Sequence, residues 1–455
     1  MMDVTAIILA AGQGTRMKSK LPKVLHKVAG KPMLGHVLDT LKIAGVQRQI
    51  VVLGHGSDII EKWLPEEVEV AYQKQQLGTG HALLQAQGLL QKTKGTVMVV
   101  CGDTPLLQAS TLKGLLNTHN NTNAQVTVLT ADIANPTGYG RIIRENSQVK
   151  AIIEEKDADI HQKAITEINT GSYCFEAQFL QDYLGKLTND NAQSEYYLTD
   201  LVKLAATNNL RVEGFLLEDF TESLGINNRV QLAEAEKILR TRVLKDLMLA
   251  GVTIIDPQST YIEATVKIAP DTIIYPGTLL EGQTSIGEDC HIGPGVRMID
   301  TIVGDSCQIQ NAVLLECKVN NNCKIGPFAY LRPGAVLEDN VKIGDFVEIK
   351  KSVIGKGSKV PHLSYVGDAF VGEGVNIGCG TITCNYDGKN KHLTKIENGA
   401  FIGSNTNLVA PVTVGKNAFI GAGSTINKDV PANALAIARE KQKNIPDWVK
   451  NQNKE

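Results

Sequence analysis

The sequence predicts an α/β protein in which a mostly parallel, helix-covered sheet is followed by a long helix and a parallel β-solenoid. Its 455 residues exceed the ~100–200 residues of a typical domain, which indicates several folded units. Glycine is unevenly distributed, with 19 of the 42 glycines in residues 1–250 and 23 in the shorter segment 251–455. The second segment also repeats aliphatic residues every six positions, a period that neither a helix nor a flat strand explains.

Composition and charge exclude several classes of partner. Hydrophobic residues make up 43% of the chain and the longest apolar runs, such as Ile7–Ala11, are strand-sized, so we expect no membrane partner. A formal net charge of −2 provides no basic surface for nucleic acid but permits small phosphorylated partners. The N-terminal residues lack a secretion signal and the eight cysteines include no CxxC pair, so we expect a cytoplasmic protein.

The first half alternates strand-like and helix-like segments. Helical patterns such as 33–43 and 80–90 separate short β-branched runs, which are Ala6–Leu9, Gln49–Leu53, Val97–Cys101 and Val126–Leu129. This order predicts a mostly parallel sheet wrapped by helices.

One amphipathic helix is predicted over residues 229–250, before Gly251. Its apolar positions are Val230, Ile238, Leu239, Leu247 and Met248, set among Glu, Lys and Arg. We interpret this helix as a linker, which divides the chain into a first domain 1–228, the linker 229–250 and a second domain 251–455.

The six-residue period predicts a solenoid whose coils place one aliphatic residue at each interior position. The positions are Ile268, Ile274, Leu280, Ile286 and Ile292, then Val303, Ile309 and Leu315, then Val319, Ile325, Leu331, Leu337, Ile343 and Ile349, and finally Ile396, Ile402, Leu408, Val414, Ile420 and Ile426. Glycine commonly follows them, as at Gly287 and Gly344, where a tight corner favours a residue without Cβ. Residues 383–395 interrupt the period, so we expect a loop to leave the coil there.

A glycine-rich turn follows the first predicted strand, in LAAGQGTRM at 9–17, with Pro22 and Lys23 shortly after it. It lacks the ending of a P-loop, and Met17 stands where a dinucleotide fingerprint needs a small residue. The motif resembles the signature of sugar-1-phosphate nucleotidylyltransferases, which implies a Rossmann-like nucleotidyltransferase domain. In such an enzyme, Arg16 and Lys23 are suited to holding the triphosphate and neutralising the leaving pyrophosphate. A surface turn with unrelated basic residues is the alternative.

Asp103 follows the run Val97–Cys101 and Gly102, which places its carboxylate at the carboxyl end of a strand, where open α/β sheets bind ligands. One carboxylate there suits Mg²⁺, which takes few protein oxygens and completes its shell with phosphate and water. An Asp in this position is otherwise often a turn or helix cap. The resemblance implies that Asn227 is the second protein ligand of the metal.

The hexapeptide repeats of the second domain resemble those of acyltransferases, and this resemblance implies that His362 is the general base. Acetyl transfer from a thioester to a sugar amine requires a neutral amine, and an imidazole can take the amine's proton during attack. A lone histidine is more often structural or solvated, and the three histidines beyond the linker do not form a zinc cluster. The surrounding SKVPHLSYVGD and the repeats resemble hexapeptide acyltransferases, which implies a left-handed parallel β-helix.

The resemblance extends over the whole chain, to the family of bifunctional N-acetylglucosamine-1-phosphate uridyltransferases/glucosamine-1-phosphate N-acetyltransferases. It implies that the first domain binds UTP and N-acetylglucosamine 1-phosphate through Leu9, Ala10, Ala11, Gly12, Lys23, Gln73, Gly78, Thr79, Gly140, Glu154, Asn169 and Asn227. It implies that the second domain binds glucosamine 1-phosphate through Arg332, Lys350, Tyr365 and Asn376, where the two cations suit the phosphate.

The resemblance also implies an acetyl-CoA site and a homotrimer with sites at subunit boundaries. The acetyl-CoA positions are Cys379, Asn385, Tyr386, Ser404, Ala422 and Arg439. Cys379 stands where the family is expected to have alanine; we interpret it as a packing thiol rather than a nucleophile. Two alternatives stay open, a monofunctional sugar-1-phosphate nucleotidylyltransferase with a regulatory or oligomerising β-helix, and a solenoid that is only a scaffold.

Overall fold

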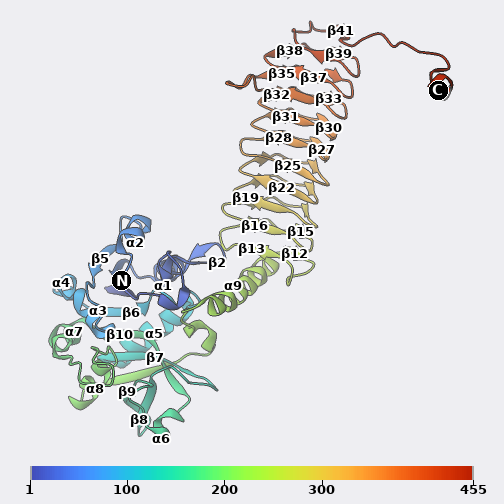
Figure 1. Cartoon of the computed structure of the whole chain (residues 1–455). Helices are drawn as coiled ribbons and strands as arrows, with labels where there is room; N and C mark the ends of the chain where they lie inside the picture. The colour runs from blue at the N-terminus through green and yellow to red at the C-terminus, as the bar shows by residue number, and fades with distance from the viewer. Residues whose placement is uncertain (1–2, 453–455) are drawn as a thin grey trace. The chain divides into compact units, whose positions relative to one another are not determined.

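The computed structural model describes residues 3–452 and contains two compact units that divide at Leu239/Arg240. The first unit is a sheet covered by helices, and the second is a stack of short strands (Figure 1). No helix within residues 3–452 combines the length and the apolar character needed to cross a membrane.

The first unit is built on a mixed sheet with the strand order β11-β7-β10-β6-β1-β4-β5. Neighbouring strands are parallel except for β10, which runs antiparallel to both β6 and β7. The strands are β1 (Val4–Ala10), β4 (Arg48–Leu53), β5 (Glu69–Tyr72), β6 (Thr96–Cys101), β7 (Val126–Asp132), β10 (Glu167–Glu176) and β11 (Val212–Leu216). The prediction of a mostly parallel sheet is therefore confirmed, with one antiparallel strand inside it.

Helices cover both faces of this sheet, because alternate residues of each strand point to opposite sides. Ile8 of β1 packs in one core with Leu38 of α1 and Leu115 of α5, whereas Ile7 packs in another with Leu83 of α3 and Leu201 of α8. The α-helices of this layer are α1 (Met33–Ala44), α2 (Ser57–Trp63), α3 (Thr79–Gln85), α4 (Gln87–Leu90), α5 (Ala109–Thr122), α6 (Ile160–Lys163), α7 (Ala177–Tyr183) and α8 (Asp200–Thr207).

Small elements complete the first unit. The antiparallel hairpin of β8 (Arg141–Glu145) and β9 (Gln148–Ile153) joins the sheet through β10. The other elements are the pair β2 (Lys27–Val28) and β3 (Lys31–Pro32), and the 3₁₀ turns η1 (Thr15–Met17), η2 (Lys23–Leu25), η3 (Leu184–Lys186) and η4 (Phe220–Ser223).

The predicted helix is α9 (Arg229–Leu249), and it belongs to both units. Ala235 lies in an apolar cluster of the first unit, whereas Leu244 lies in the core of the solenoid. Two positions assigned to its apolar face are exposed, Val230 at 69% and Met248 at 40%, so the helix does not have one continuous buried face. The sequence pattern was wrong there because each half of the helix packs against a different core.

The second unit is a solenoid of three parallel sheets. The first sheet contains β12 (Thr253–Ile254), β15 (Ile273–Ile274), β18 (His291–Ile292), β21 (Gln308–Ile309), β24 (Lys324–Ile325), β27 (Lys342–Asp345), β30 (Lys359–His362), β33 (Asn376–Ile377), β36 (Phe401–Ile402), β39 (Phe419–Ile420) and β41 (Leu435–Ala436). The second contains β13 (Tyr261–Ile262), β16 (Leu279–Glu281), β19 (Arg297–Ile299), β22 (Ala312–Leu315), β25 (Ala329–Leu331), β28 (Glu348–Lys350), β31 (Tyr365–Gly367), β34 (Ile382–Cys384), β37 (Asn407–Val409) and β40 (Thr425–Ile426). The third contains β14 (Lys267–Ile268), β17 (Ser285–Ile286), β20 (Ile302–Val303), β23 (Lys318–Val319), β26 (Val336–Leu337), β29 (Val353–Ile354), β32 (Ala369–Val371), β35 (Thr394–Ile396) and β38 (Val412–Val414).

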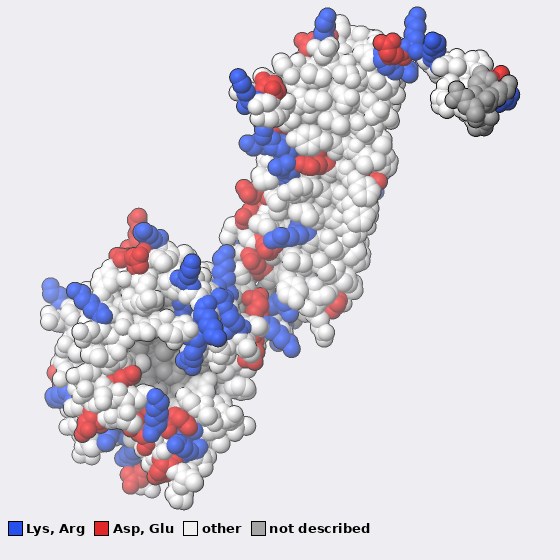
Figure 2. Space-filling view, in the orientation of Figure 1, with Lys and Arg blue, Asp and Glu red and all other residues white. Residues whose placement is uncertain are grey.

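The predicted aliphatic positions are buried in the interior of the solenoid except for Ile268, which is partly buried, and Leu315. Leu314, not Leu315, is fully buried, and Met298 fills the interior position between Ile292 and Val303. The chain advances five residues instead of six from Ile309 to Leu314, which shifts the register by one position. Figure 2 shows that much of the visible solenoid surface carries few charged side chains.

The expected loop leaves the coil between β34 and β35. An isolated antiparallel bridge joins Tyr386 to Lys391, so the loop is a small hairpin. Asp387 stabilises it by accepting hydrogen bonds from the backbone N–H groups of Lys389 and Asn390 at 2.8 and 2.7 Å. A short helix, α10 (Trp448–Gln452), lies near the end of the described chain.

Candidate active sites

The glycine-rich turn after β1 opens into a cavity of about 290 Å³ at the carboxyl ends of the parallel strands. Most of the residues predicted to contact the nucleotide line it, together with Asp103. The predicted residues in the lining are Leu9, Ala10, Ala11, Gly12, Lys23, Gln73, Gly78, Thr79 and Asp103. Cys101 and Glu195 also line the cavity and were not expected from the sequence.

Four predicted residues from distant segments meet beside this cavity. Lys23 forms an ion pair with Asp103, and its Nζ donates to Oδ1 of Asn227 at 3.1 Å. Nη2 of Arg16 donates to the same oxygen at 3.0 Å. The side chains of Lys23 and Asp103 are only 13% and 20% exposed, so the pair lies largely out of water. The resulting group can hold phosphates with its cations and a metal with its two oxygens.

The predicted sugar residues form a second cluster. The N–H of Asn169 donates to the carbonyl of Gly140 at 2.9 Å, and Oε1 of Glu154 accepts from the Thr199 hydroxyl at 3.1 Å. A Cβ placed on Gly140 would lie 3.5 Å from Oε2 of Glu154, so these three residues are neighbours. Burial raises the pKa of Glu154.

Buried Arg141 links the segment that contains Gly140 to the segment that contains Glu154. Its Nη2 lies 2.7 Å from Oε2 of Glu155, and the guanidinium also contacts the carbonyl of Tyr139. Burial and, secondarily, the charge of Asp103 raise the pKa of Tyr139. The N–H of Gly171 donates to Oδ1 of Asn169 at 3.0 Å, and the carbonyl of Gly171 accepts from Sγ of Cys101, which lines the cavity, so the sugar cluster adjoins the cavity.

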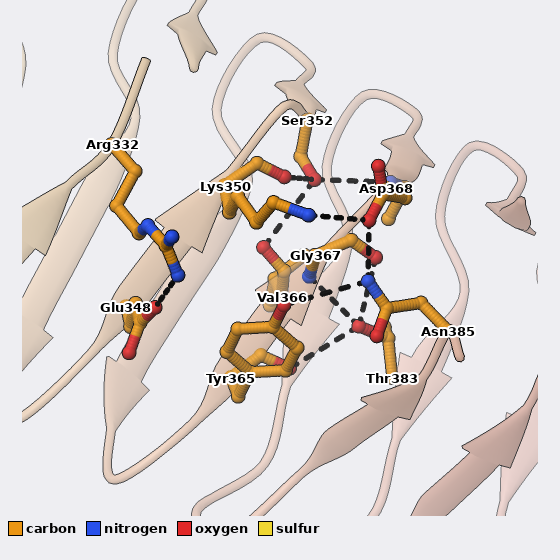
Figure 3. Close-up of polar contacts among 11 residues, drawn as sticks. Arg332, Glu348, Lys350, Ser352, Tyr365, Val366, Gly367, Asp368, Thr383 and Asn385 are labelled. Atoms are coloured by element: carbon orange, nitrogen blue, oxygen red, sulfur yellow. Dashed lines mark hydrogen bonds and ion pairs between the residues drawn. The ribbon is translucent and has the colours of Figure 1, made fainter. Parts of the chain in front are cut away.

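The solenoid carries a separate polar group on its second sheet (Figure 3). Arg332 directly follows β25, and Lys350 is the last residue of β28, so the two residues are neighbours in adjacent coils. Arg332 pairs with Glu348 at 2.8 Å, and Lys350 pairs with Asp368 at 3.0 Å. Nδ2 of Asn385 contacts the same Asp368 carboxylate and lies 3.4 Å from the Tyr365 hydroxyl.

Lys391 of the hairpin loop adds a further cation, which the sequence analysis missed. Contact with Lys350 lowers the pKa of Lys391, whereas contacts with Lys391 and Asp368 raise the pKa of Lys350. Two ammonium groups held beside each other repel unless an anion lies between them. This convergence is suited to a phosphate dianion.

His362 lies at the end of β30, directly above Asp345 of the preceding coil. Its Nδ1 is 2.5 Å from Oδ1 of Asp345, and this hydrogen bond lowers the pKa of Asp345. Because Nδ1 is engaged, Nε2 is left to act as a base. The side chain of His362 is exposed, so a bound substrate can reach it.

The comparisons with known proteins match both units. A MobA-like NTP transferase domain matches residues 6–164, bacterial transferase hexapeptide repeats match 316–351 and 393–428, and a hexapeptide repeat of succinyl-transferase matches 283–317. "Bifunctional protein GlmU" from Heliobacterium modesticaldum is 58% identical and covers 96% of each chain. The proteins of the same name from Geobacillus sp. and Brevibacillus brevis are both 54% identical and cover 98% and 99% of this chain and 97% and 98% of their own. The chain belongs to the GlmU family.

Four of the six predicted acetyl-CoA positions lie on or beside one corner of the solenoid. The strand register places Cys379 one coil beyond His362, followed by Ser404 and Ala422. A Cβ on Gly423 would lie 3.7 Å from Cδ of Arg439, which puts Arg439 beside the same corner. The predicted fold, including the left-handed parallel β-helix of hexapeptide repeats, is confirmed.

Two predicted positions lie apart from these groups. Asn376 is on β33, in a different sheet from Lys350 and Tyr365, and within residues 3–452 no hydrogen bond joins it to them. The Tyr386 hydroxyl donates to the carbonyl of Gly388 inside the hairpin at 2.7 Å. A single copy of this GlmU chain therefore does not bring the whole predicted acetyl-transfer set together.

Sequence reasoning missed Asp345, Glu348 and Asp368, although one signal was present. Asp345 precedes His362 by 17 residues, which is one coil of the solenoid. Residues one coil apart in a parallel β-solenoid stack ~4.8 Å from each other, so the coil spacing identifies such pairs. Asp368 precedes Asn385 by the same interval and contacts it.

Proposed function

We infer that the chain is a bifunctional enzyme that makes UDP-N-acetylglucosamine in two steps. The solenoid unit acetylates glucosamine 1-phosphate with acetyl-CoA, and the first unit transfers UMP from UTP to N-acetylglucosamine 1-phosphate with release of pyrophosphate. The observation that carries this conclusion is that relatives named as bifunctional match the chain over 96–99% of its length, across both units. A monofunctional nucleotidyltransferase with a regulatory β-helix is not favoured, since the match includes the whole solenoid.

In the first unit, we assign the cavity at the glycine-rich turn to UTP and the cluster of Gly140, Glu154 and Asn169 to the sugar. A phosphate oxygen of N-acetylglucosamine 1-phosphate attacks the α-phosphorus of UTP, and the bond to the β-phosphate oxygen breaks as pyrophosphate leaves. Arg16 and Lys23 neutralise the negative charge that develops on the leaving group. Gln73, Gly78 and Thr79 are assigned to the uracil end of the cavity.

We assign Asp103 and Asn227 as protein ligands of Mg²⁺. The residues fit this ion, because one carboxylate and one amide oxygen lie close together and leave the rest of the shell to phosphate and water. When bound, Mg²⁺ neutralises phosphate charge in the transition state. Within residues 3–452 there is no cluster of three or more His, Cys, Asp or Glu side chains that could hold a metal without substrate.

In the solenoid unit, we assign His362 as the general base. Nε2 takes a proton from the amine of glucosamine 1-phosphate while the nitrogen attacks the thioester carbonyl, and the C–S bond then breaks to release CoA thiolate, which takes up a proton. Asp345 orients the imidazole through Nδ1. Arg332 and Lys350, helped by Lys391, hold the sugar phosphate.

We assign the corner column of Cys379, Ser404 and Ala422, with Arg439, to acetyl-CoA, and Asn385, Tyr386 and Tyr365 to the acetyl end of the site. Because Asn376 lies on another sheet, we propose that a neighbouring copy supplies it in a homotrimer. Exposed rings on the solenoid support association, since Phe401 and Phe419 stack with centroids 4.4 Å apart on its surface.

We place the enzyme in the cytoplasm, where both small substrates are expected. All eight cysteines carry free thiols, as expected of a protein in a reducing compartment. We assign uridyl transfer to residues 1–228, the linker role to 229–250 and acetyl transfer to 251–455.

Two variants test the assignment of two independent sites. His362→Ala is expected to lose thiol release from acetyl-CoA while pyrophosphate formation continues, and Asp103→Ala is expected to show the reverse. Exposed His161→Gln is the matched control for the histidine change. Loss of both activities in both variants would contradict independent sites.

A further inference from the structure

The ammonium of Lys23 occupies the position proposed for the metal. It forms an ion pair with Asp103 and donates to Oδ1 of Asn227 at 3.1 Å, so it contacts both oxygens assigned to Mg²⁺. We propose that Lys23 is a cationic placeholder, which fills the metal position in the free enzyme and leaves it when a nucleoside triphosphate binds. This inference rests on the proposed metal site at Asp103 and Asn227, and it predicts that metal affinity depends on nucleotide.

An ammonium and a metal ion cannot occupy these two oxygens together. Mg²⁺ binds oxygen at about 2.0–2.1 Å and excludes other cations from the same lone pairs. Repulsion between two cations a few ångströms apart is strong where water is scarce, and the Lys23 side chain is 13% exposed. Binding of the metal therefore requires that Lys23 move.

Hydrogen bonds that do not involve Lys23 also hold the segments of the two assigned metal ligands. The N–H of Ile226 donates to the carbonyl of Asp103 at 3.0 Å, which ties the two segments together through their backbones. The N–H of Asn227 donates to Oε1 of Gln231 at 2.8 Å. Removing the ammonium thus leaves the Asp103 carboxylate and the Asn227 amide oxygen close together, with Nη2 of Arg16 still donating to that amide oxygen at 3.0 Å.

Lys23 also has an alternative partner within its reach. Its stem lies against the glycine-rich turn, since a Cβ on Gly14 would be 2.7 Å from the Cβ of Lys23. The cavity that the turn and Lys23 line is the proposed phosphate position. Lysine has four rotatable side-chain bonds, so the ammonium can turn from Asp103 to a phosphate while the stem remains fixed.

The exchange makes nucleotide and metal binding cooperative. In the free enzyme the ammonium of Lys23 balances the charge of the Asp103 carboxylate, so little net negative charge is left to attract a divalent ion. A triphosphate attracts Lys23, frees Asp103 and adds its own oxygens to the metal shell. Because coupling is reciprocal, the metal also strengthens nucleotide binding.

Binding of Mn²⁺ to the nucleotide-free full chain tests the proposal, with free Mn²⁺ measured by electron paramagnetic resonance. Lys23→Met is expected to bind Mn²⁺ at least tenfold more tightly than the wild type, and Lys23→Ala is expected to do the same. The exposed Lys20 of the same loop supplies the control, because Lys20→Met is expected to leave Mn²⁺ affinity unchanged. Adding Asp103→Asn to Lys23→Met is expected to abolish the gain. A circular dichroism spectrum and a cooperative unfolding transition like those of the wild type verify that each variant is folded.

Two outcomes would contradict the proposal, and they distinguish an error in the role of Lys23 from an error in the assigned metal site. If both Lys23 variants are folded and bind Mn²⁺ no more tightly than the wild type, while Asp103→Asn loses Mg²⁺-dependent pyrophosphate formation, the placeholder is wrong and the metal site stands. If Asp103→Asn retains Mg²⁺-dependent pyrophosphate formation at the wild-type rate, the proposed metal site is wrong and the placeholder with it.

Discussion

Nδ1 of His362 lies 2.5 Å from Oδ1 of Asp345, one coil earlier in the solenoid. A carboxylate in this position fixes the orientation of the imidazole and stabilises it after it has taken a proton. The pair therefore links the regular stacking of the coils directly to the proposed acetyl-transfer chemistry.

Asp345→Ala is expected to lower the kcat of acetyl transfer about 10- to 100-fold, a part of the ~10²–10⁴-fold that a positioned base contributes. The KM for glucosamine 1-phosphate is expected to stay near the wild-type value, because Asp345 does not contact the proposed phosphate site. Steady-state thiol release measures both parameters. Asp345→Asn, which keeps an acceptor oxygen, is expected to retain more activity than Asp345→Ala, and an equal loss in both variants would contradict a role for the orienting hydrogen bond.

Lys350→Met is expected to raise the KM for glucosamine 1-phosphate about tenfold or more, since a hydrogen bond to a charged group contributes ~1.5–3 kcal/mol. The KM for acetyl-CoA is expected to change little, because the predicted acetyl-CoA column lies on a different corner. Lys356→Met, an exposed lysine of the same solenoid, is the matched control. Equal increases in both KM values would show that Lys350 supports the coil rather than the phosphate.

The sequence predicted the interior of the solenoid well because each coil obeys one rule. An aliphatic residue every six positions marks the inside, and nearly all of the predicted positions are buried. Leu315 and the overlooked Met298 occur where the chain advances five residues, and Ile268 is only partly buried. A five-residue step leaves no composition signal, so only the three-dimensional register shows it.

Residues of the candidate sites could be predicted where a sequence motif contains them. They could not be predicted where the contacting residues come from separate coils or loops. Arg16, Lys23, Asp103 and Asn227 were identified from the sequence, and they meet in the structure. Their mutual contacts were not expected, because the sequence does not show which side chain lies between two others. Lys391 was missed for the same reason, since it reaches Lys350 only through the fold of the hairpin loop.

Buried His119 on α5 is expected to make the stability of the first unit depend on pH. Burial lowers its pKa from 6.5 to about 4, and Nδ1 lies 2.9 Å from the Thr127 hydroxyl. Between these two pH values the unfolded chain binds a proton that the folded chain does not. The free energy of unfolding is therefore complete above about pH 6.5 and falls as the pH drops towards 4, by about 3 kcal/mol in total.

Calorimetric unfolding between pH 4.5 and 7.5 checks this expectation. His119→Gln is expected to reduce the loss of Tm at low pH, because glutamine does not titrate and can still bond Thr127. His161→Gln, at an exposed position, is expected to keep the wild-type slope. An unchanged slope in His119→Gln would assign the pH dependence to other groups.

The absence of a Cβ at Gly14 allows the side chain of Lys23 to lie against the glycine-rich turn. It has φ 64°, and an added Cβ would lie 2.7 Å from the Cβ of Lys23. Gly45, after α1, also has a positive φ, of 96°, but nothing lies within 4 Å of its added Cβ. Each change to alanine is expected to cost about 1–2 kcal/mol of stability through the backbone alone.

Comparison of the alanine variants of Gly14 and Gly45 therefore distinguishes the effect of backbone strain from the effect of displacing Lys23. Gly14→Ala is expected to slow pyrophosphate formation about 10- to 100-fold, because the ammonium moves away from the phosphates, whereas Gly45→Ala keeps the wild-type rate. Acetyl transfer is expected to be unchanged in both, since its site lies on the solenoid. Rates from both assays, with a Tm for each variant, decide the matter: equal rates of pyrophosphate formation in the two variants would mean that the close approach of Gly14 to Lys23 has no part in uridyl transfer.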